Sequence, residues 1–342
     1  MQRIGFILLG FACLVLIGQA LSHESNPTEQ ESDKTSAPKD EELLVSLGVN
    51  SNSEIAESSG VAISSFVKDA IWTHNDSGHK NRLFLLKTDG KLLAYLDLQT
   101  SQNSDWESMV RFNLDGKSYL MVGDVGDNTK RRKNYQLYVV PEPDLSASLT
   151  NAKPDRLPVR HSVKPVKLDF TYEDGPKNCE AIAVDVLARQ IWLVEKIYVD
   201  PRIKTPPGIY VLPLSIQQTA KPLVAKRIAD FPPRNVSGMD FSPDGKRLII
   251  RNYVNAHLYV REKNETWEES IKTTNPASVV LPLQRQGEAV CFTNDSRAII
   301  LTSEFLRQPI WQVKMDQYFE LPRRMKKKTP VDGESVPEEL GK

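Results

Sequence analysis

Short apolar runs, some alternating with polar residues and some continuous, recur along most of the chain. They include AIWTH (70–74), RLFLL (82–86), SYLMV (118–122), QIWLV (190–194) and RLIIR (247–251). Asp-Gly, Asn-Asp or Pro-containing turns separate them, and a helical spacing of apolar residues is nearly absent. Runs of this length with turn residues between them are typical of β-strands. The pattern therefore predicts an all-β fold.

A motif recurs within these runs, with a Glu or Ser followed by a small residue and then alternating apolar residues. It reads SSGVAI (58–63), WESMVR (106–111), CEAIAV (179–184), VSGMDF (236–241) and GEAVCF (287–292). We call its first shared place the motif position, which holds Ser59, Glu107, Glu180, Ser237 and Glu288. The intervals between them are 48, 73, 57 and 51 residues. Each has room for about four strands, as a blade of a β-propeller requires.

The repeat predicts a five-bladed β-propeller, with the motif strand innermost in each blade. A small residue after the motif position suits the crowded axis of such a ring. The fifth unit lacks a fourth strand at its end, and residues 43–49 can supply it from the other end of the chain. That closure would remove open sheet edges. A sixth blade hidden in the 73-residue interval is the alternative, although two long loops account for its excess length.

Polar residues are expected to gather at one mouth of the central channel. In antiparallel sheets the start of the first strand and the end of the second lie at the same end. The candidate ligand-binding residues are therefore Glu107, Glu180, Glu288, His74, Asn75, Asp76, Lys196 and Arg251. The candidate metal ligands are Asp124, Glu195 and Glu304.

So many carboxylates in one concavity must be compensated by cations, hydrogen bonds or raised pKa values. Calcium, which binds about 6–8 oxygen ligands in flexible geometry, is one solution and the cofactor we consider. A network with Lys196, Arg251 and backbone amides is another, and it needs no ligand. In that case the glutamates of the motif position only hold neighbouring blades together.

The segment GDVGDN (123–128) is weak as a metal loop, because it lacks the further ligands and the terminal Glu of an EF-hand. The cations that follow it at 130–133 can screen or capture an anion, or form a solvated hairpin tip. Paired-His metal motifs, CxxC and phosphate-binding glycine loops are absent from the sequence. Cys179 and Cys291 fall at different depths of non-adjacent units, so we expect no disulfide between them.

The two ends differ in composition from the repeats. Residues 1–22 have the basic start, apolar stretch and small residues of a signal peptide, which predicts a secreted or periplasmic protein; an N-terminal membrane anchor is the alternative. Residues 23–42 and 321–342 are expected to be a disordered tether and tail around a propeller domain at 43–320. Lys+Arg and Asp+Glu both total 44. This balance gives no reason to expect a nucleic-acid partner, and we expect a monomer without a membrane span after signal cleavage.

The order of the motifs, Ser-Gly, Glu-Ser, Glu-Ala, Ser-Gly and Glu-Ala, resembles that of the SdiA-regulated family of bacterial exported propellers. The likeness covers about residues 43 to 315. It implies a five-bladed propeller outside the cytoplasm, with ligands and calcium at the mouth, as in the more distant phytase-like propellers. One departure is Arg251-Asn252, where the family's second strands usually end in an acidic residue.

Three functions follow as hypotheses. The first is an exported propeller that binds a small ligand or a protein partner at the mouth, with calcium as the cofactor considered. The second is a calcium-assisted hydrolase of phosphate or other esters, in which a metal-bound water attacks. The third is a scaffold without a ligand site.

Overall fold

The computed structural model describes residues 43–318, which form an all-β fold as the sequence predicts. The helical elements within these residues are short: α1 (Ser146–Asn151), α2 (Trp267–Thr273), η2 (Pro154–Arg156) and η3 (Asp316–Tyr318). None of them is long and apolar enough to cross a membrane. The predicted signal peptide, tether and most of the predicted tail lie outside the described residues.

The strands form two four-stranded sheets, one five-stranded sheet and one eight-stranded sheet. The five-stranded sheet contains β2 (Ser58–Ile63), β3 (Ala70–Asn75), β4 (Arg82–Lys87), β5 (Leu92–Leu98) and β9 (Val159–Val163). One four-stranded sheet contains β15 (Val236–Phe241), β16 (Arg247–Asn252), β17 (Asn255–Val260) and β18 (Ala277–Val280). The other contains β19 (Gly287–Phe292), β20 (Ala298–Ser303), β21 (Pro309–Lys314) and β1 (Leu44–Val49).

The eight-stranded sheet consists of two antiparallel halves. One half contains β6 (Trp106–Leu114), β7 (Lys117–Asp124), β8 (Tyr135–Pro141) and β10 (Val166–Tyr172). The other contains β11 (Cys179–Asp185), β12 (Gln190–Glu195), β13 (Gly208–Pro213) and β14 (Leu223–Asp230). The halves meet where β10 and β14 pair in parallel over three residues, at their outer strands. Each half therefore has the same antiparallel order as the four-stranded sheets.

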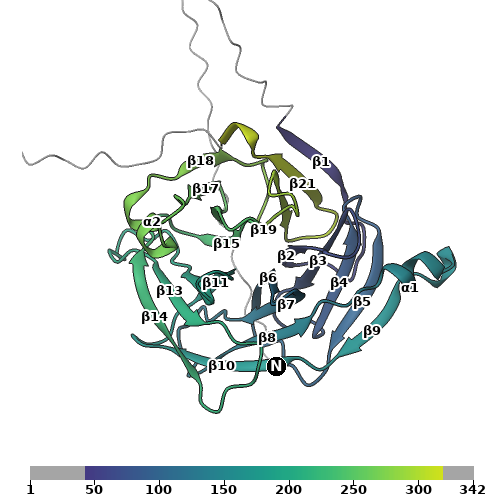
Figure 1. The fold of residues 1–342 in the computed structure, drawn as a ribbon, viewed down its shortest axis with the longest axis horizontal. Helices are drawn as coiled ribbons and strands as arrows, with labels where there is room; N and C mark the ends of the chain where they lie inside the picture. The colour runs from purple at the N-terminus through teal and green to yellow at the C-terminus, as the bar shows by residue number, and fades with distance from the viewer. Residues whose placement is uncertain (1–42, 319–342) are drawn as a thin grey trace, which may run out of the picture. The chain divides into compact units, whose positions relative to one another are not determined.

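The five motif strands β2, β6, β11, β15 and β19 contact one another in cyclic order, with β19 returning to β2. They surround the centre of the described unit in Figure 1. The small residue after the motif position permits this approach. A Cβ added to Gly238 would lie 2.9 Å from the carbonyl oxygen of Glu288 in the next motif strand. Larger side chains at this depth would force the strands apart.

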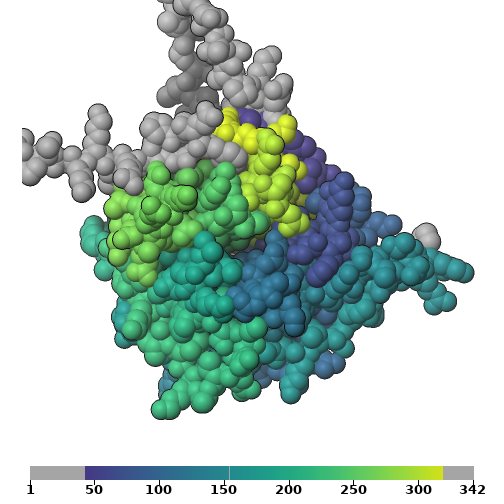
Figure 2. All heavy atoms as spheres, in the orientation of Figure 1, coloured from purple at the N-terminus to yellow at the C-terminus, as the bar shows by residue number. Residues whose placement is uncertain are grey.

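The two ends of the described chain share a sheet. β1 pairs antiparallel with β21, with Leu44 opposite Val313 and Val49 opposite Pro309. This pairing was predicted for residues 43–49 and is confirmed. Figures 1 and 2 show the purple β1 beside the yellow end of the described chain. The first strand therefore covers an edge of β21 that would otherwise be open.

The long 73-residue interval holds α1, η2 and β9 in addition to β10. β9 runs parallel to β5, with Ala94 opposite Val159 and Leu98 opposite Val163, and becomes a fifth strand of the sheet that β2 begins. β10 pairs antiparallel with β8 and continues the sheet of the motif strand β6. The extra length of this interval is thus used on the outer edge of the preceding sheet.

Hydrophobic clusters fill the space between neighbouring sheets. One cluster joins Trp72 and Leu85 of the β2–β5 sheet to Met109 and Leu120 of the next sheet, and Trp106 lies fully buried within it. Truncating a buried aromatic of this size to alanine typically costs about 3–5 kcal/mol. Cys179 and Cys291 are buried free thiols. The packing between sheets, with no disulfide among the described residues, holds the ring together.

Candidate functional site: the acidic mouth

A β-bulge marks the motif position of each inner strand. The pairing of β2 with β3 shifts between Ser58 and Gly60, which leaves Ser59 without an opposite residue. The same irregularity occurs at Glu107, Glu180, Ser237 and Glu288. A bulge inserts one residue into a strand and redirects its side chain. The bulges therefore explain how these largely buried strands each place a polar side chain at the same end.

Carboxylates from several sheets lie within each other's electrostatic reach at this end. Burial raises the pKa of Asp76 to about 6, that of Glu180 to about 7 and that of Glu304 to about 8. The negative charge of Glu288 adds to all three rises. We call the group Asp76, Asp105, Glu107, Glu180, Glu288 and Glu304 the acidic mouth.

Glu180 is neutralised by a cation from the neighbouring strand end. The Nζ of Lys196 lies 2.6 Å from one carboxylate oxygen of Glu180, and the amide of Asn178 donates to the other oxygen at 3.1 Å. The ammonium also lies 4.9 Å from the ring centre of Tyr253 and 5.3 Å from that of Tyr198. Burial lowers the pKa of Lys196, but the adjacent carboxylates outweigh burial and raise it overall. Lys196 therefore stays charged.

Glu288 and Glu304 share one amide donor. The Nε2 of Gln286 donates to Glu288 at 2.9 Å and to Glu304 at 2.6 Å. The hydroxyl of Ser59 also donates to Glu304, at 3.3 Å. These bonds link two motif positions to the end of β20. They hold the two carboxylates in place without supplying a positive charge.

Asp76, Asp105 and Glu107 form the group that can hold a metal ion. One oxygen from each lies within 4.8 Å of the others. No Lys, Arg or His within residues 43–318 forms an ion pair with any of the three. Burial raises the pKa of each, and for Glu107 the charges of Glu180 and Asp76 add to the rise. This side of the mouth therefore has clustered negative charge without a cation in direct contact.

Two of the predicted metal ligands have partners of their own. Asp124 is fully buried and accepts from Arg132 Nη1 at 2.7 Å. Glu195 accepts from Lys130 Nζ at 2.7 Å. Within residues 43–318, Asp124, Glu195 and Glu304 are not among the groups whose potential ligand atoms lie close together. The cationic loop thus screens Asp124 and Glu195, and we do not place the metal there.

The Asp127 carboxylate in the same loop accepts hydrogen bonds from the backbone of that loop. It accepts from the N–H groups of Arg131 at 2.9 Å and Arg132 at 2.7 Å, and from the Tyr135 hydroxyl at 3.0 Å. Burial acts to raise its pKa, but these hydrogen bonds outweigh burial and lower it. The GDVGDN segment therefore forms a turn bonded to its own backbone, from which Arg132 reaches Asp124 and Lys130 reaches Glu195.

His74 and Asn75, both predicted ligand-binding residues, are buried in the wall of the mouth. The His74 ring packs edge-on against Trp106, with 5.6 Å between ring centres, and burial lowers its pKa to about 4. The Asn75 side chain accepts from Glu57 N–H at 3.1 Å and donates to the carbonyl of Glu54 at 2.6 Å. Asn75 thus supports the segment that leads into β2, and His74 packs against the next motif strand, β6.

Arg251 is also fully buried. Its Nη1 donates to the carbonyl of Ala289 at 3.1 Å and to the side chain of Gln284 at 3.2 Å. A Cβ on Gly287 would lie 1.9 Å from Nη2, so a larger residue there would displace the Arg251 side chain from this position. Burial lowers the pKa of Arg251 to about 10, against the opposing charge of Glu288. In this arrangement Arg251 joins β16 to the next motif strand and is shielded from an external anion.

The sequence contained a signal for Asp105 that we did not use. Asp105 lies two residues before the motif position Glu107. The same place in the other repeats holds Glu57, Asn178, Asn235 and Gln286, so each repeat carries an acid or amide there. Asn178 and Gln286 donate to their own motif glutamates. In the second unit an acid replaces the amide donor, which adds negative charge instead of a hydrogen bond.

No protein-family model matches the chain, and neither does any curated protein. Similar solved structures include a gluconolactonase of Xanthomonas campestris, with 10% identity over 79% of this chain and 89% of that chain and a TM-score of 0.38. The Kuenenia stuttgartiensis hydrazine synthase has 13% identity over 72% of this chain and 68% of that chain, with a TM-score of 0.39. The Neurospora crassa Pan2 WD40 domain has 10% identity over 79% of this chain and 95% of that chain, with a TM-score of 0.39. These values carry no argument about function, and the resemblance to the SdiA-regulated family stays a prediction.

Proposed function

We propose that residues 43–318 form a five-bladed β-propeller whose acidic mouth binds calcium through Asp76, Asp105 and Glu107. The cyclic contacts of β2, β6, β11, β15 and β19 support the blade count, as does the four-strand antiparallel order that begins at each of them. In this proposal, a small ligand or a protein partner binds at the same mouth and completes the coordination of the ion.

The chemistry of the donors fits calcium. Calcium prefers hard oxygen ligands and takes about 6–8 of them, so three carboxylates leave positions for water and a ligand. The observation that carries the proposal is the close approach of three carboxylates within 4.8 Å without an ion-paired cation in the described part of the chain. A bound cation would relieve the repulsion that raises the pKa of Glu107, beyond the effect of burial.

The surroundings of the trio suit a small polar ligand. Tyr198 is about half exposed, and Lys196 beside it carries a fixed positive charge. Tyrosine rings offer flat apolar contact together with a hydroxyl, a combination common where ligands bind. The Tyr198 hydroxyl already donates to Asn128 at 2.9 Å, which fixes the ring at the rim.

Hydrolysis of an ester is the second candidate function, and Glu304 is the observation that favours it. Burial raises its pKa to about 8, so this half-buried carboxyl can exchange a proton near neutral pH. Its charge also interacts with Asp76 of the proposed calcium site. Hydrolysis of p-nitrophenyl phosphate or p-nitrophenyl acetate that requires calcium and is lost in Glu304→Gln would support this function. If neither ester is hydrolysed with or without calcium, ligand binding is the remaining function.

Calcium-dependent thermal unfolding tests the binding proposal. An ion that binds only the folded state stabilises it by about 2.7 kcal/mol at one hundred times its Kd, so the Tm should rise with calcium concentration. Glu107→Gln and Asp105→Asn keep the shape of the side chains and should each remove most of this response. Asp115→Asn, an exposed acid in a turn, is the matched control and should retain it.

A wild-type Tm that does not respond to calcium or EDTA would contradict the proposal. The carboxylates would then serve contacts between blades, which is the scaffold hypothesis. Loss of the calcium response in Asp115→Asn as well would show that calcium acts through general surface charge.

A further inference from the structure

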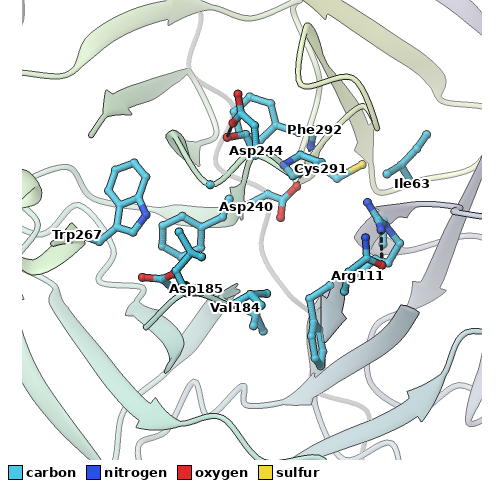
Figure 3. Close-up of a pocket in the computed structure, with 18 residues that line it drawn as sticks. Ile63, Arg111, Val184, Asp185, Asp240, Asp244, Trp267, Cys291 and Phe292 are labelled. Carbon is cyan, nitrogen blue, oxygen red and sulfur yellow. Dashed lines mark hydrogen bonds between the residues drawn. The ribbon is translucent and has the colours of Figure 1, made fainter. Parts of the chain in front are cut away.

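A cavity of about 190 Å³ lies at the other end of the inner strands. It is lined by Ile63 at the end of β2, Phe112 in β6, Val184 in β11, Phe241 at the end of β15 and Phe292 at the end of β19. The motif positions stand at the opposite ends of the same strands, about 13–17 Å away at 3.3 Å per residue. Figure 3 shows Ile63, Val184 and Phe292 around one central space. We call it the rear cavity.

The carboxylate of Asp240 is buried in the lining of this cavity. Asp240 is 8% exposed, and its Oδ2 accepts from the N–H of Phe292 at 2.7 Å. Within residues 43–318 no Lys, Arg or His forms an ion pair with it. Burial raises its pKa to about 7, because an isolated charge is costly in such surroundings. Figure 3 shows the Asp240 carboxylate near the middle of the lining residues.

One arginine faces the same cavity without an acidic partner in the described residues. Arg111 donates to neutral oxygens only: its Nη1 to Ser65 Oγ at 2.9 Å and Asn113 Oδ1 at 3.2 Å, and its Nη2 to Asn294 Oδ1 at 2.9 Å. Its Nε is buried and lacks a hydrogen-bond partner among residues 43–318. The positive charge of Arg111 acts on Asp240 but lies beyond the 4.0 Å of an ion pair.

Cys291 is a titratable group close to both charges. Its thiol is buried, and burial raises its pKa well above the ordinary value, so it stays protonated. Asp185 and Asp244 also line the cavity but have partners of their own. Asp185 accepts from the N–H of Leu187 at 3.0 Å, and Asp244 pairs with Arg247 at 3.0 Å. Asp185 also lacks an ion-pair partner in the described residues, but its Oδ1 already accepts from the N–H groups of both Leu187 and Ala188. Asp240 and Arg111 are therefore the two opposite charges that we consider for a ligand in this cavity.

We propose that the rear cavity binds a small zwitterion with an apolar body, an α-amino acid with a hydrophobic side chain. Its ammonium group would pair with Asp240, its carboxylate would pair with the guanidinium group of Arg111, and its side chain would contact Phe112, Phe241 and Phe292. An amine alone would leave Arg111 unpaired and would be repelled by it. A carboxylic acid alone would leave Asp240 unpaired. Only a ligand that carries both charges satisfies both residues.

The volume agrees with this class of ligand. Ligand pockets for drug-sized molecules are about 300–1,000 Å³, so a cavity of 190 Å³ suits something smaller. The inference is independent of calcium, since no residue of the acidic mouth lines the rear cavity. Failure of either proposal would leave the other intact.

Isothermal titration calorimetry on the full-length protein tests the inference with three probes of matching apolar body: L-leucine, isoamylamine and 4-methylpentanoate. Leucine should bind saturably, and each singly charged probe should bind about tenfold more weakly or worse, since a charged hydrogen bond contributes about 1.5–3 kcal/mol. Asp240→Asn and Arg111→Gln should each weaken leucine binding by a similar factor. Arg297→Gln removes an exposed charge elsewhere and should bind leucine as the wild type does.

Absence of saturable leucine binding to the wild type would overturn the inference. So would isoamylamine binding as tightly as leucine, because Arg111 would then have no role. The comparison of probes uses the wild type alone and therefore decides the question even if Asp240→Asn or Arg111→Gln fails to fold. Leucine binding that survives both substitutions would also overturn it.

Discussion

Glu107 and Glu180 occupy the same motif position in neighbouring repeats, on the same kind of β-bulge, and both are buried. Glu180 has the Lys196 ammonium at 2.6 Å, whereas Glu107 has Asp76 and Asp105 as its close neighbours. The strand that follows each motif strand accounts for the difference. β7 ends in Asp124 and β12 ends in the matching Glu195, but β12 continues into Lys196 whereas β7 continues into the apolar Val125.

This difference shows how one repeated architecture handles the same electrostatic problem in two ways. On the Glu180 side the chain supplies the compensating cation. On the Glu107 side no cation of the described chain contacts the carboxylates directly. Their negative charge can then be compensated by protonation or by a cation from solution. The side that lacks a cation of its own is therefore where we expect metal binding, and the side that has one is where we expect rigidity.

Replacement of Lys196 should have the largest effect. Lys196→Met leaves Glu180 buried without its ion-pair partner, which typically costs about 3–5 kcal/mol of unfolding free energy. Urea denaturation measures it. The loss should be greater at pH 9 than at pH 6, because protonation of Glu180 at the lower pH relieves the unpaired charge. The double variant Lys196→Met/Glu180→Gln should recover much of it, and a single variant within 1 kcal/mol of the wild type would contradict this account of the Glu180 side.

The pH dependence of stability should be intermediate in size. Asp76, Glu180 and Glu304 have pKa values raised to about 6, 7 and 8, above the values near 4 of unfolded chains. Between about pH 4 and pH 8 the folded state therefore binds more protons than the unfolded state. In EDTA the unfolding free energy should fall as pH rises through this window.

Saturating calcium should flatten that decline, because the ion takes the place of the protons at Asp76 and its neighbours. Urea titrations at several pH values, with calcium and with EDTA, measure both curves. A stability that rises with pH in EDTA across this window would mean that the mouth carboxylates are compensated within the chain. The contrast between the two sides of the mouth would then disappear.

An exposed ion pair gives the smallest effect and serves as a reference. Arg189 lies 3.0 Å from Asp115, a distance similar to that of the buried pair, but both side chains are more than half exposed. Arg189→Gln should change the unfolding free energy by less than about 1 kcal/mol. A loss comparable to that of Lys196→Met would show that burial does not decide the strength of these pairs.

Much of the fold could be predicted from the sequence because each repeat carries the same short residue pattern. The small residue after Glu107 and Glu180 marks the crowded inner strand. The last repeat lacks a fourth strand at its end, which predicted that residues 43–49 supply it, and β1 does so. The parallel attachment of β9 to β5 was not predicted, since nothing in a short edge strand specifies which neighbouring sheet it joins.

The site was harder to predict, because charge compensation depends on side-chain directions. Strand ends alone suggested Asp124 and Glu195 as metal ligands, but Lys130 and Arg132 reach back from their loop to pair with them. That contact follows from the turn around Asp127, not from residue spacing. Asp105, by contrast, was visible in the repeat two places before Glu107, where the third, fourth and fifth repeats have an amide.

The position of a bound ion tests the central claim most directly. Crystals of the protein grown with calcium, measured at a wavelength where calcium scatters anomalously, should show an anomalous peak contacted by oxygens of Asp76, Asp105 and Glu107. The same map for Glu107→Gln should lack that peak. A peak coordinated by Asp124 or Glu195 instead, or no peak at the acidic mouth at saturating calcium, would contradict the account.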